Sequence, residues 1–316
     1  MASPFTPANG PQHSVNSYTV GWITALPDEL QAAQIMLDEE HAEPYDFSQP
    51  QNDSNTYTYG RVGEHHVIIT GMPRPYGTTS AATTATETTN SHPNLRFVCS
   101  SVSELVYHDP SMTFVWEMSL SAILEANPSP GANDSVSELT GHIGAPPQAL
   151  QKVVTDLSTR HEREESKIPA IMEDALEKYP KLKKSKKWDR PSSETDLLFQ
   201  ETFYRNGDLS WKQKVGEDYR PEGQYIRPVR DDSCPVVHLG IIGSGNTLEK
   251  DVNDRERILL RMLPAEALCL EMESGGVMNV FPSLVIRGIC DFGDRRKNDV
   301  WPLTRRCQIR VSLRLF

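Results

Sequence analysis

Apolar and polar positions in the first hundred residues follow two different periods. Residues 18–26, YTVGWITAL, alternate and then run apolar, which is typical of a buried strand. The next stretch, PDELQAAQIMLDEEH, opens with Pro27 and spaces its apolar residues as a helix does. Residues 55–72 predict a hairpin with the letters GRVGEH between its strands. Residues 77–92 are rich in small side chains and predict a helix able to lie close to a sheet.

Strands and helices continue to alternate after Ala145. We predict helices at 145–166, 168–196 (its second half a basic loop) and 251–263, strands at 234–246 and 283–294, and a strand running into a helix at 267–281. Alternation of this kind is the signature of an α/β fold. The sequence therefore predicts a single α/β domain with a mixed central sheet flanked by helices.

Polar and glycine residues gather where these predicted strands end. In open α/β sheets, ligands bind at the carboxyl ends of the strands, so we expect these residues to converge on one site. The candidates are Glu29, Ser244, Gly245, Asn246, Glu271, Met272, Glu273 and Asp291. Residues 240–246, GIIGSGN, have a G-x-x-G-x-G spacing, which differs from the dinucleotide fingerprint G-x-G-x-x-G, so we predict no dinucleotide site.

Composition narrows the functional classes. A formal net charge of -11 argues against a general nucleic-acid binder. The sequence contains no run of eighteen apolar residues, which is the pattern that would predict a membrane span. The N-terminal residues have no basic start and no apolar stretch, so we expect a disordered tail at 1–17 and a cytoplasmic protein. Five scattered cysteines without a CxxC motif predict free thiols, with no disulfide framework and no zinc site.

Three stretches together resemble the nucleoside phosphorylase and nucleosidase superfamily. They are VGWITALPDEL at 20–30, GIIGSGN at 240–246, and LEMESGGVMN at 270–279 followed by LVIRGICDFGD at 284–294. The last pair is the most specific, and the details are similar to a fungal branch of the superfamily. The resemblance covers about residues 18–97 and 140–301, and it implies cleavage of the N-glycosidic bond of purine-type nucleosides by phosphate or water.

The resemblance also implies roles for the candidates. Asp291 would protonate the leaving base, and Glu273 would bind the ribose hydroxyls and stabilise the cationic transition state. Met272 would pack against the sugar, with Glu271 as a weaker carboxylate candidate. Glu29 matches the position that activates water in the nucleosidases. Each acid has a plainer alternative: Asp291 could be satisfied at a strand end, and Glu29 and Glu273 could be acids of a first helical turn.

Ser244, Gly245 and Asn246 match the turn beside the base. Cys290 stands where bacterial nucleosidases commonly have serine, which leaves the base preference open. The resemblance implies no metal and no organic cofactor, with phosphate as an optional co-substrate. The partner would be a small nucleoside, with no nucleic acid and no membrane, and the protein would form a homo-oligomer.

Residues 98–122 contain no glycine, although the family has a glycine-rich, phosphate-binding loop there. Read one base out of frame, their permitted codons can spell RLLVGIGAGVPRPQHDIRLGDVVVS, which holds both missing family motifs in order. The test is constrained, because Trp116 and Met118 each have a single codon. We interpret 98–139 as a frame-shifted segment within a domain at 18–301, and 302–316 as an atypical tail.

This interpretation leaves three hypotheses open. In the sequence as given, unrelated residues replace two core strands and the anion-binding loop of the family. Glu104 would then lie near the phosphate position and repel phosphate. An intact relative would be a phosphorylase or a hydrolase, and the altered loop is the part that decides between them. Alternatively, the chain is a catalytically dead nucleoside-binding or signalling module, or a mis-predicted product that folds poorly.

Overall fold

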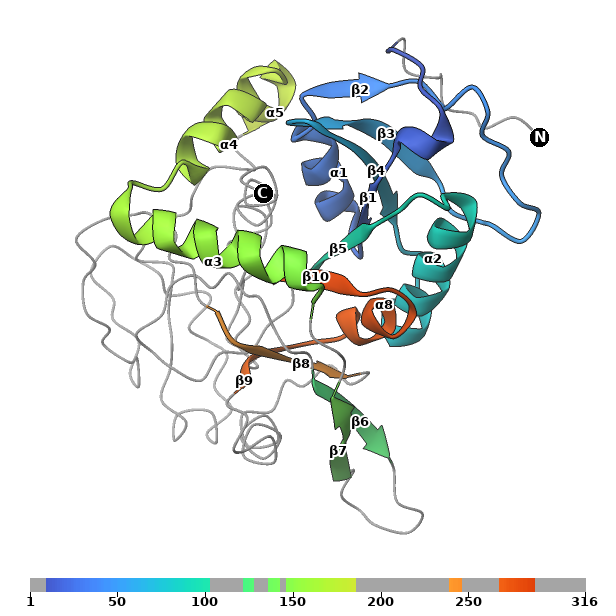
Figure 1. The fold of residues 1–316 in the computed structure, drawn as a ribbon, viewed down its shortest axis with the longest axis vertical. Coiled ribbons are helices and arrows are strands. Elements are labelled where there is room, and N and C mark those ends of the chain that lie inside the picture. The colour runs from blue at the N-terminus through green and yellow to red at the C-terminus, as the bar shows by residue number, and fades with distance from the viewer. Residues whose placement is uncertain are drawn as a thin grey trace, which may run out of the picture.

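The computed structural model describes residues 10–102, 122–127, 136–142, 146–185, 239–245 and 267–287. Within these residues, two sheets are flanked by helices (Figure 1). The first sheet has the order β10-β5-β1-β4-β3-β2 and the second the order β7-β6-β8-β9. The predicted α/β class, a mixed sheet flanked by helices, is confirmed.

The first sheet is parallel in its centre and antiparallel at one edge. Its strands are β1 (Val20–Thr24), β2 (Glu39–His41), β3 (Tyr57–Val62), β4 (His65–Gly71), β5 (Phe97–Val102) and β10 (Ser283–Arg287). β1 pairs in parallel with β4 and β5, and β5 pairs in parallel with β10. The predicted hairpin is confirmed as β3 and β4, which turn at Gly63 with a φ of 57°.

The second sheet combines an antiparallel pair with two parallel pairs. Its strands are β6 (Ala122–Asn127), β7 (Val136–His142), β8 (Ile241–Gly245) and β9 (Ala267–Glu271). β6 pairs antiparallel with β7 and parallel with β8, and β8 pairs parallel with β9. The carboxyl ends of β8 and β9 therefore lie at one edge.

Helices cover both faces of the first sheet. They are α1 (Pro27–Ile35), α2 (Thr78–Ser91), α3 (Gln148–Arg163), α4 (Ile168–Glu177), α5 (Pro180–Ser185) and α8 (Ser274–Val280). Trp22 and Ile69 pack with residues of α1, α3 and α4 on one face. Ile23 and Val98 pack with residues of α2 and α8 on the other, so the alternation along β1 serves two cores. None of the described helices is long and apolar enough to cross a membrane.

Two sequence predictions differ from the structure, and a third lies outside the described residues. The helix that begins at Pro27 ends at Ile35, and Glu39–His41 form the edge strand β2 because they pair with β3. Residues 10–17, placed in the predicted tail, pack along residues 40–46, where the Ala42 N–H donates to the Pro11 carbonyl at 3.1 Å. The predicted helix at 251–263 lies outside the described residues.

Strands form in parts of the predicted frame-shifted segment. β5 lies inside the first sheet, between β1 and the end strand β10, and its Val98 is fully buried. β6 lies in the second sheet between β7 and β8. Residues 103–121 and 128–135, which include the site of the expected anion loop and Glu104, lie outside the described residues.

The amino-terminal turns of α2 and α8 meet at very close range (Figure 1). A Cβ atom placed on Gly276 would overlap with the carbonyl group of Thr78. α2 follows the carboxyl end of β4, and α8 follows the carboxyl end of β9. This glycine contact therefore joins the helices that follow the carboxyl ends of β4 and β9, one strand from each sheet.

We predict that Gly276→Ala lowers the free energy of unfolding by roughly 1–3 kcal/mol, because the added methyl group meets backbone that cannot yield. Gly71→Ala is the matched control, since its Cβ would meet the nearest atom, Leu30 Cδ2, at an ordinary 3.4 Å. Urea unfolding followed by circular dichroism measures both variants. Equal stability of the two variants would contradict the proposed contact.

Candidate functional site

Glu271 ends β9 and closes the first turn of α8. One carboxylate oxygen accepts hydrogen bonds from the backbone N–H groups of Glu273 and Ser274, each at 2.8 Å. The other accepts a hydrogen bond from the Ser274 hydroxyl. The Glu271 side chain is buried, and these bonds satisfy donors that the start of a helix leaves without intrahelical partners. The geometry makes Glu271 an anchor of the turn that carries Glu273.

Ser244 connects β8 to the same helix. Its fully buried hydroxyl oxygen accepts a hydrogen bond from the backbone N–H of Gly275 at 2.9 Å. Gly245 is the next residue and the last of β8. The parallel pairing of β8 with β9 thus places both strand ends at the first turn of α8.

Glu273 stands at the position preceding α8, between its two anchors. Its residue is only 4% exposed, and one carboxylate oxygen accepts a hydrogen bond from the Met272 N–H at 3.3 Å. Met272 itself is partly buried. A carboxylate held this far from bulk water is a strong electrostatic partner for a nearby cationic centre, because the local dielectric constant is low.

Glu29 is held in a different turn, at the carboxyl end of β1. It is the third residue of α1, fully buried, and one carboxylate oxygen accepts hydrogen bonds from the N–H groups of Ala25 at 2.9 Å and Leu26 at 3.0 Å. This is the geometry of an acid in a first helical turn, and it also fixes the direction of the carboxylate.

The structure thus brings together five of the eight predicted site residues at the start of α8. These are Ser244, Gly245, Glu271, Met272 and Glu273. Glu29 lies at the end of a strand in the first sheet. Asn246 and Asp291 lie outside the described residues. Among the described residues, Ser274 was not predicted as part of the site. Its position directly after E-M-E, where a strand was predicted to run into a helix, was a signal that could have identified it.

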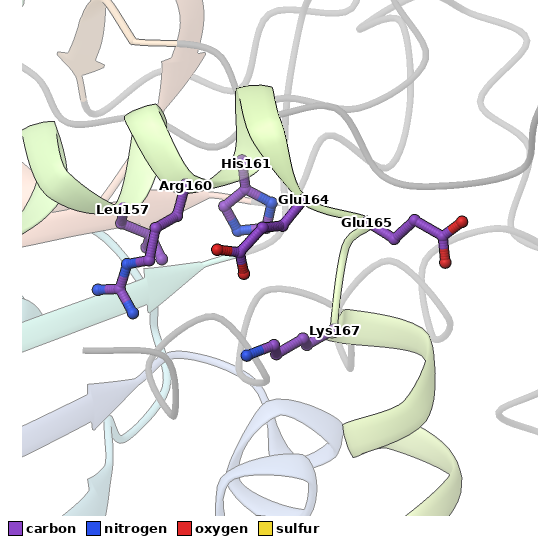
Figure 2. Close-up of a pocket in the computed structure, with 6 residues that line it drawn as sticks. All are labelled: Leu157, Arg160, His161, Glu164, Glu165 and Lys167. Carbon is purple, nitrogen blue, oxygen red and sulfur yellow. The ribbon is translucent and has the colours of Figure 1, made fainter.

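A pocket of another kind lies where α3 meets α4 (Figure 2). Leu157 and five polar or charged side chains line it: Arg160, His161, Glu164, Glu165 and Lys167. Burial, followed by the charge of Arg160, lowers the pKa of His161. None of the six predicted site residues that the structure describes lines this pocket, so it is separate from the turn at the start of α8.

Comparison with known proteins places this geometry in a wider context. No family model matches the chain. A nucleotide-binding leucine-rich repeat (NLR)-like protein of Hyaloscypha variabilis is 31% identical over 303 residues, covering 92% of this chain and 28% of that protein. The chain therefore spans little more than a quarter of the length of this relative.

Solved structures match over nearly the whole chain. Futalosine hydrolase of Helicobacter pylori has a TM-score of 0.53 at 12% identity, covering 94% of this chain and 95% of its own. A mutant 5'-methylthioadenosine nucleosidase of the same organism, with 5'-methylthioadenosine in its active site, reaches 0.55 at 10% identity, covering 94% and 97%. The 5'-methylthioadenosine/S-adenosylhomocysteine nucleosidase of Neisseria meningitidis scores 0.53 at 13% identity, covering 94% and 97%.

The chain has the nucleosidase-type α/β fold. The superfamily fold implied by the E-M-E and R-G-x-x-D motifs is therefore confirmed. In the nucleosidase-type fold of this chain, the start of α8 is where the second sheet presents the carboxyl ends of β8 and β9.

We predict that Glu271→Gln lowers the free energy of unfolding by roughly 1.5–3 kcal/mol. The amide loses the charge that strengthens three hydrogen bonds, and it leaves buried donors poorly satisfied. Glu162→Gln makes the same chemical change at an exposed position of α3 and serves as the control. Chemical denaturation compares the two. If Glu271→Gln were as stable as Glu162→Gln, the anchoring role of Glu271 would be wrong.

Proposed function

We propose that this chain binds a purine-type nucleoside at the start of α8 and cleaves its N-glycosidic bond. The observation that carries the proposal is the buried Glu273 carboxylate, positioned by Glu271 and Ser244 at strand ends of a nucleosidase-type fold. Such a rigid carboxylate can accept hydrogen bonds from sugar hydroxyls. Its charge also favours the cationic sugar that develops as the bond breaks.

The neighbouring residues complete the proposed roles. Met272 offers an apolar surface to the sugar, and the turn at Ser244, Gly245 and Asn246 faces the base. Asp291 donates the proton that lets the base leave, because a protonated base carries less negative charge. No metal or organic cofactor takes part in this chemistry.

Water is the acceptor that we favour over phosphate. Glu29 has one carboxylate oxygen held by two backbone N–H groups, which directs the other oxygen of the same carboxylate. A carboxylate held in this way can act as a general base toward water. The solved structures with this fold include a futalosine hydrolase and several nucleosidases, which supports the same choice.

We predict that the chain releases free base from adenosine, inosine or guanosine, and that phosphate does not accelerate the release. Glu273→Gln should lower the rate roughly 100-fold or more, because one preorganised charge is lost. Asp291→Asn should lower it roughly 100-fold, because the base then leaves unprotonated. Chromatographic detection of the free base, with and without phosphate, measures both effects.

Glu64→Gln, at the exposed hairpin turn, is the matched control and should retain the full rate. Circular dichroism spectra of the variants separate lost chemistry from lost folding. Full activity of Asp291→Asn would refute its role as the acid. If phosphate accelerates the release of base, the reaction is phosphorolysis and not hydrolysis, and the role of Glu273 is unchanged.

A second candidate function is a nucleoside-binding module within a signalling protein. The NLR-like relative favours it, because this chain corresponds to only 28% of that longer protein. A binding module would keep the contacts of Glu273 with the sugar and would not release base. Calorimetric titration with adenosine distinguishes the candidates: saturable binding without free base supports the module, whereas the absence of both excludes both functions.

A further inference from the structure

Three histidine side chains meet at the edge of the first sheet opposite the carboxyl ends of its parallel strands. His13 precedes the short 3-10 helix η1 (Val15–Ser17), His41 ends β2, and His66 is the second residue of β4. One ring nitrogen from each lies within 4.8 Å of the other two. The ring centroids are 4.4–4.9 Å apart. We call these three residues the histidine cluster.

The histidine cluster contains buried nitrogen atoms without hydrogen bonds. His41 is 3% exposed, and its Nδ1 lies 3.0 Å from the Tyr18 hydroxyl. Its Nε2 has no hydrogen-bond partner, since the nearest carboxylate oxygen, on Glu39, is 3.9 Å away. Nδ1 of His66 is also buried without a hydrogen bond. Buried polar atoms are normally satisfied, so two unsatisfied imidazole nitrogens in one cluster indicate a missing partner.

The chemical state of the rings suits a cation. Burial, together with the charges of His13 and His66, lowers the pKa of His41 to about 4. Burial and the charge of His13 lower the pKa of His66 in the same direction. An uncharged imidazole keeps a lone pair on one ring nitrogen, and this lone pair can bind a metal.

We propose that His13, His41 and His66 bind a zinc ion. Neutral imidazole nitrogen is a preferred zinc ligand, with bonds of about 2.0–2.1 Å. Tetrahedral coordination sets neighbouring nitrogens about 3.4 Å apart, so the rings need to close by at most about 1.5 Å. The three ligating nitrogen atoms come from three separate segments of the described chain.

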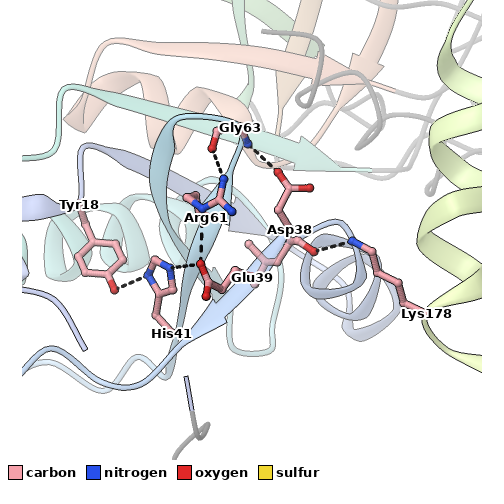
Figure 3. A network of polar contacts seen from close by, with 8 residues as sticks. Tyr18, Asp38, Glu39, His41, Arg61, Gly63 and Lys178 are labelled. Carbon is pink, nitrogen blue, oxygen red and sulfur yellow. Dashed lines mark hydrogen bonds and ion pairs between the residues drawn. The ribbon is translucent and has the colours of Figure 1, made fainter. Parts of the chain in front are cut away.

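The surroundings of His41 support the same assignment (Figure 3). When Nδ1–H donates to the Tyr18 hydroxyl, Nε2 carries the lone pair, which is the usual arrangement of a zinc-binding histidine. Glu39 is half exposed and lies beside Nε2, where its carboxylate or a water molecule supplies the fourth ligand. Arg61 Nε, at 3.6 Å from the same Glu39 oxygen, steadies that carboxylate.

The proposed zinc ion fastens the segment at residues 10–17 to the sheet. Backbone hydrogen bonds already hold this segment, including the Tyr45 N–H to the His13 carbonyl at 3.2 Å. A zinc ion bound by His13, His41 and His66 adds a link from this segment to β2 and β4. The role is structural, and it does not depend on the proposed nucleoside chemistry.

Zinc binding is tested on the full chain after its metal has been removed by dialysis against EDTA. Titration with ZnCl₂ in a calorimeter should show one site, and saturating zinc should raise the midpoint of thermal unfolding by about 5 °C. His13→Gln and His66→Gln should each weaken zinc binding at least tenfold. His65→Gln, an exposed neighbour on the same strand, should bind as the unaltered chain does.

Three further measurements characterise the site, and the first of them separates it from cysteine-based binding. Co²⁺ should give the visible absorption of a tetrahedral nitrogen and oxygen site without the thiolate charge-transfer band, and Mg²⁺ should not bind. Hydrogen exchange of residues 10–17 should slow when zinc is added. The proposal is overturned if zinc does not bind, or if it binds equally well to His13→Gln and His66→Gln. His13 precedes η1 and lies outside the strands of the sheet, so its variant should fold even where His66→Gln, a change within β4, does not.

Discussion

The candidate site depends on how the first turn of α8 is held. A seven-residue helix has few hydrogen bonds of its own, and its early N–H groups need external acceptors. Glu271 and Ser244 supply these acceptors from the ends of β9 and β8. Gly276 then lets the helix meet α2 without steric overlap. The position of Glu273 follows from these three constraints, since it lies between the anchors and cannot rotate independently of them.

A similar principle positions the segment before β3. Asp53 accepts hydrogen bonds from the Tyr57 hydroxyl and from the Ser91 hydroxyl, while Asn55 donates to the Thr84 carbonyl at 3.1 Å. These groups are buried or partly buried, and the bonds to Ser91 and Thr84 tie the approach to β3 to α2. α2 is therefore fixed at its amino end by α8 and along its length by this polar network. Rigid supports of this kind are what a binding site at strand ends requires.

The sequence predicted the elements whose patterns are local. Local patterns located these elements: an apolar run at β1, two strand-like runs around a turn at the β3–β4 hairpin, and a run of small side chains at α2. They failed at the end of α1, where pairing of Glu39–His41 with β3 outweighs the helical pattern. The motifs indicated Glu271 and Glu273 together, yet only the structure shows that Glu271 is committed to backbone N–H groups. The histidine cluster carries no sequence signal, since residues 13, 41 and 66 meet only through sheet pairing and the packing of residues 10–17.

The pairing of β10 with β5 has a consequence for synthesis of the chain. β5 ends at Val102, and its partner on one side begins only at Ser283. At ribosomal rates, roughly 10–40 s separate the emergence of the two strands. During that interval, the central sheet has a parallel strand with one unpaired edge, which other chains can occupy. A ribosome that stops early leaves the same open edge permanently, so β10 also protects the nascent molecule from aggregation.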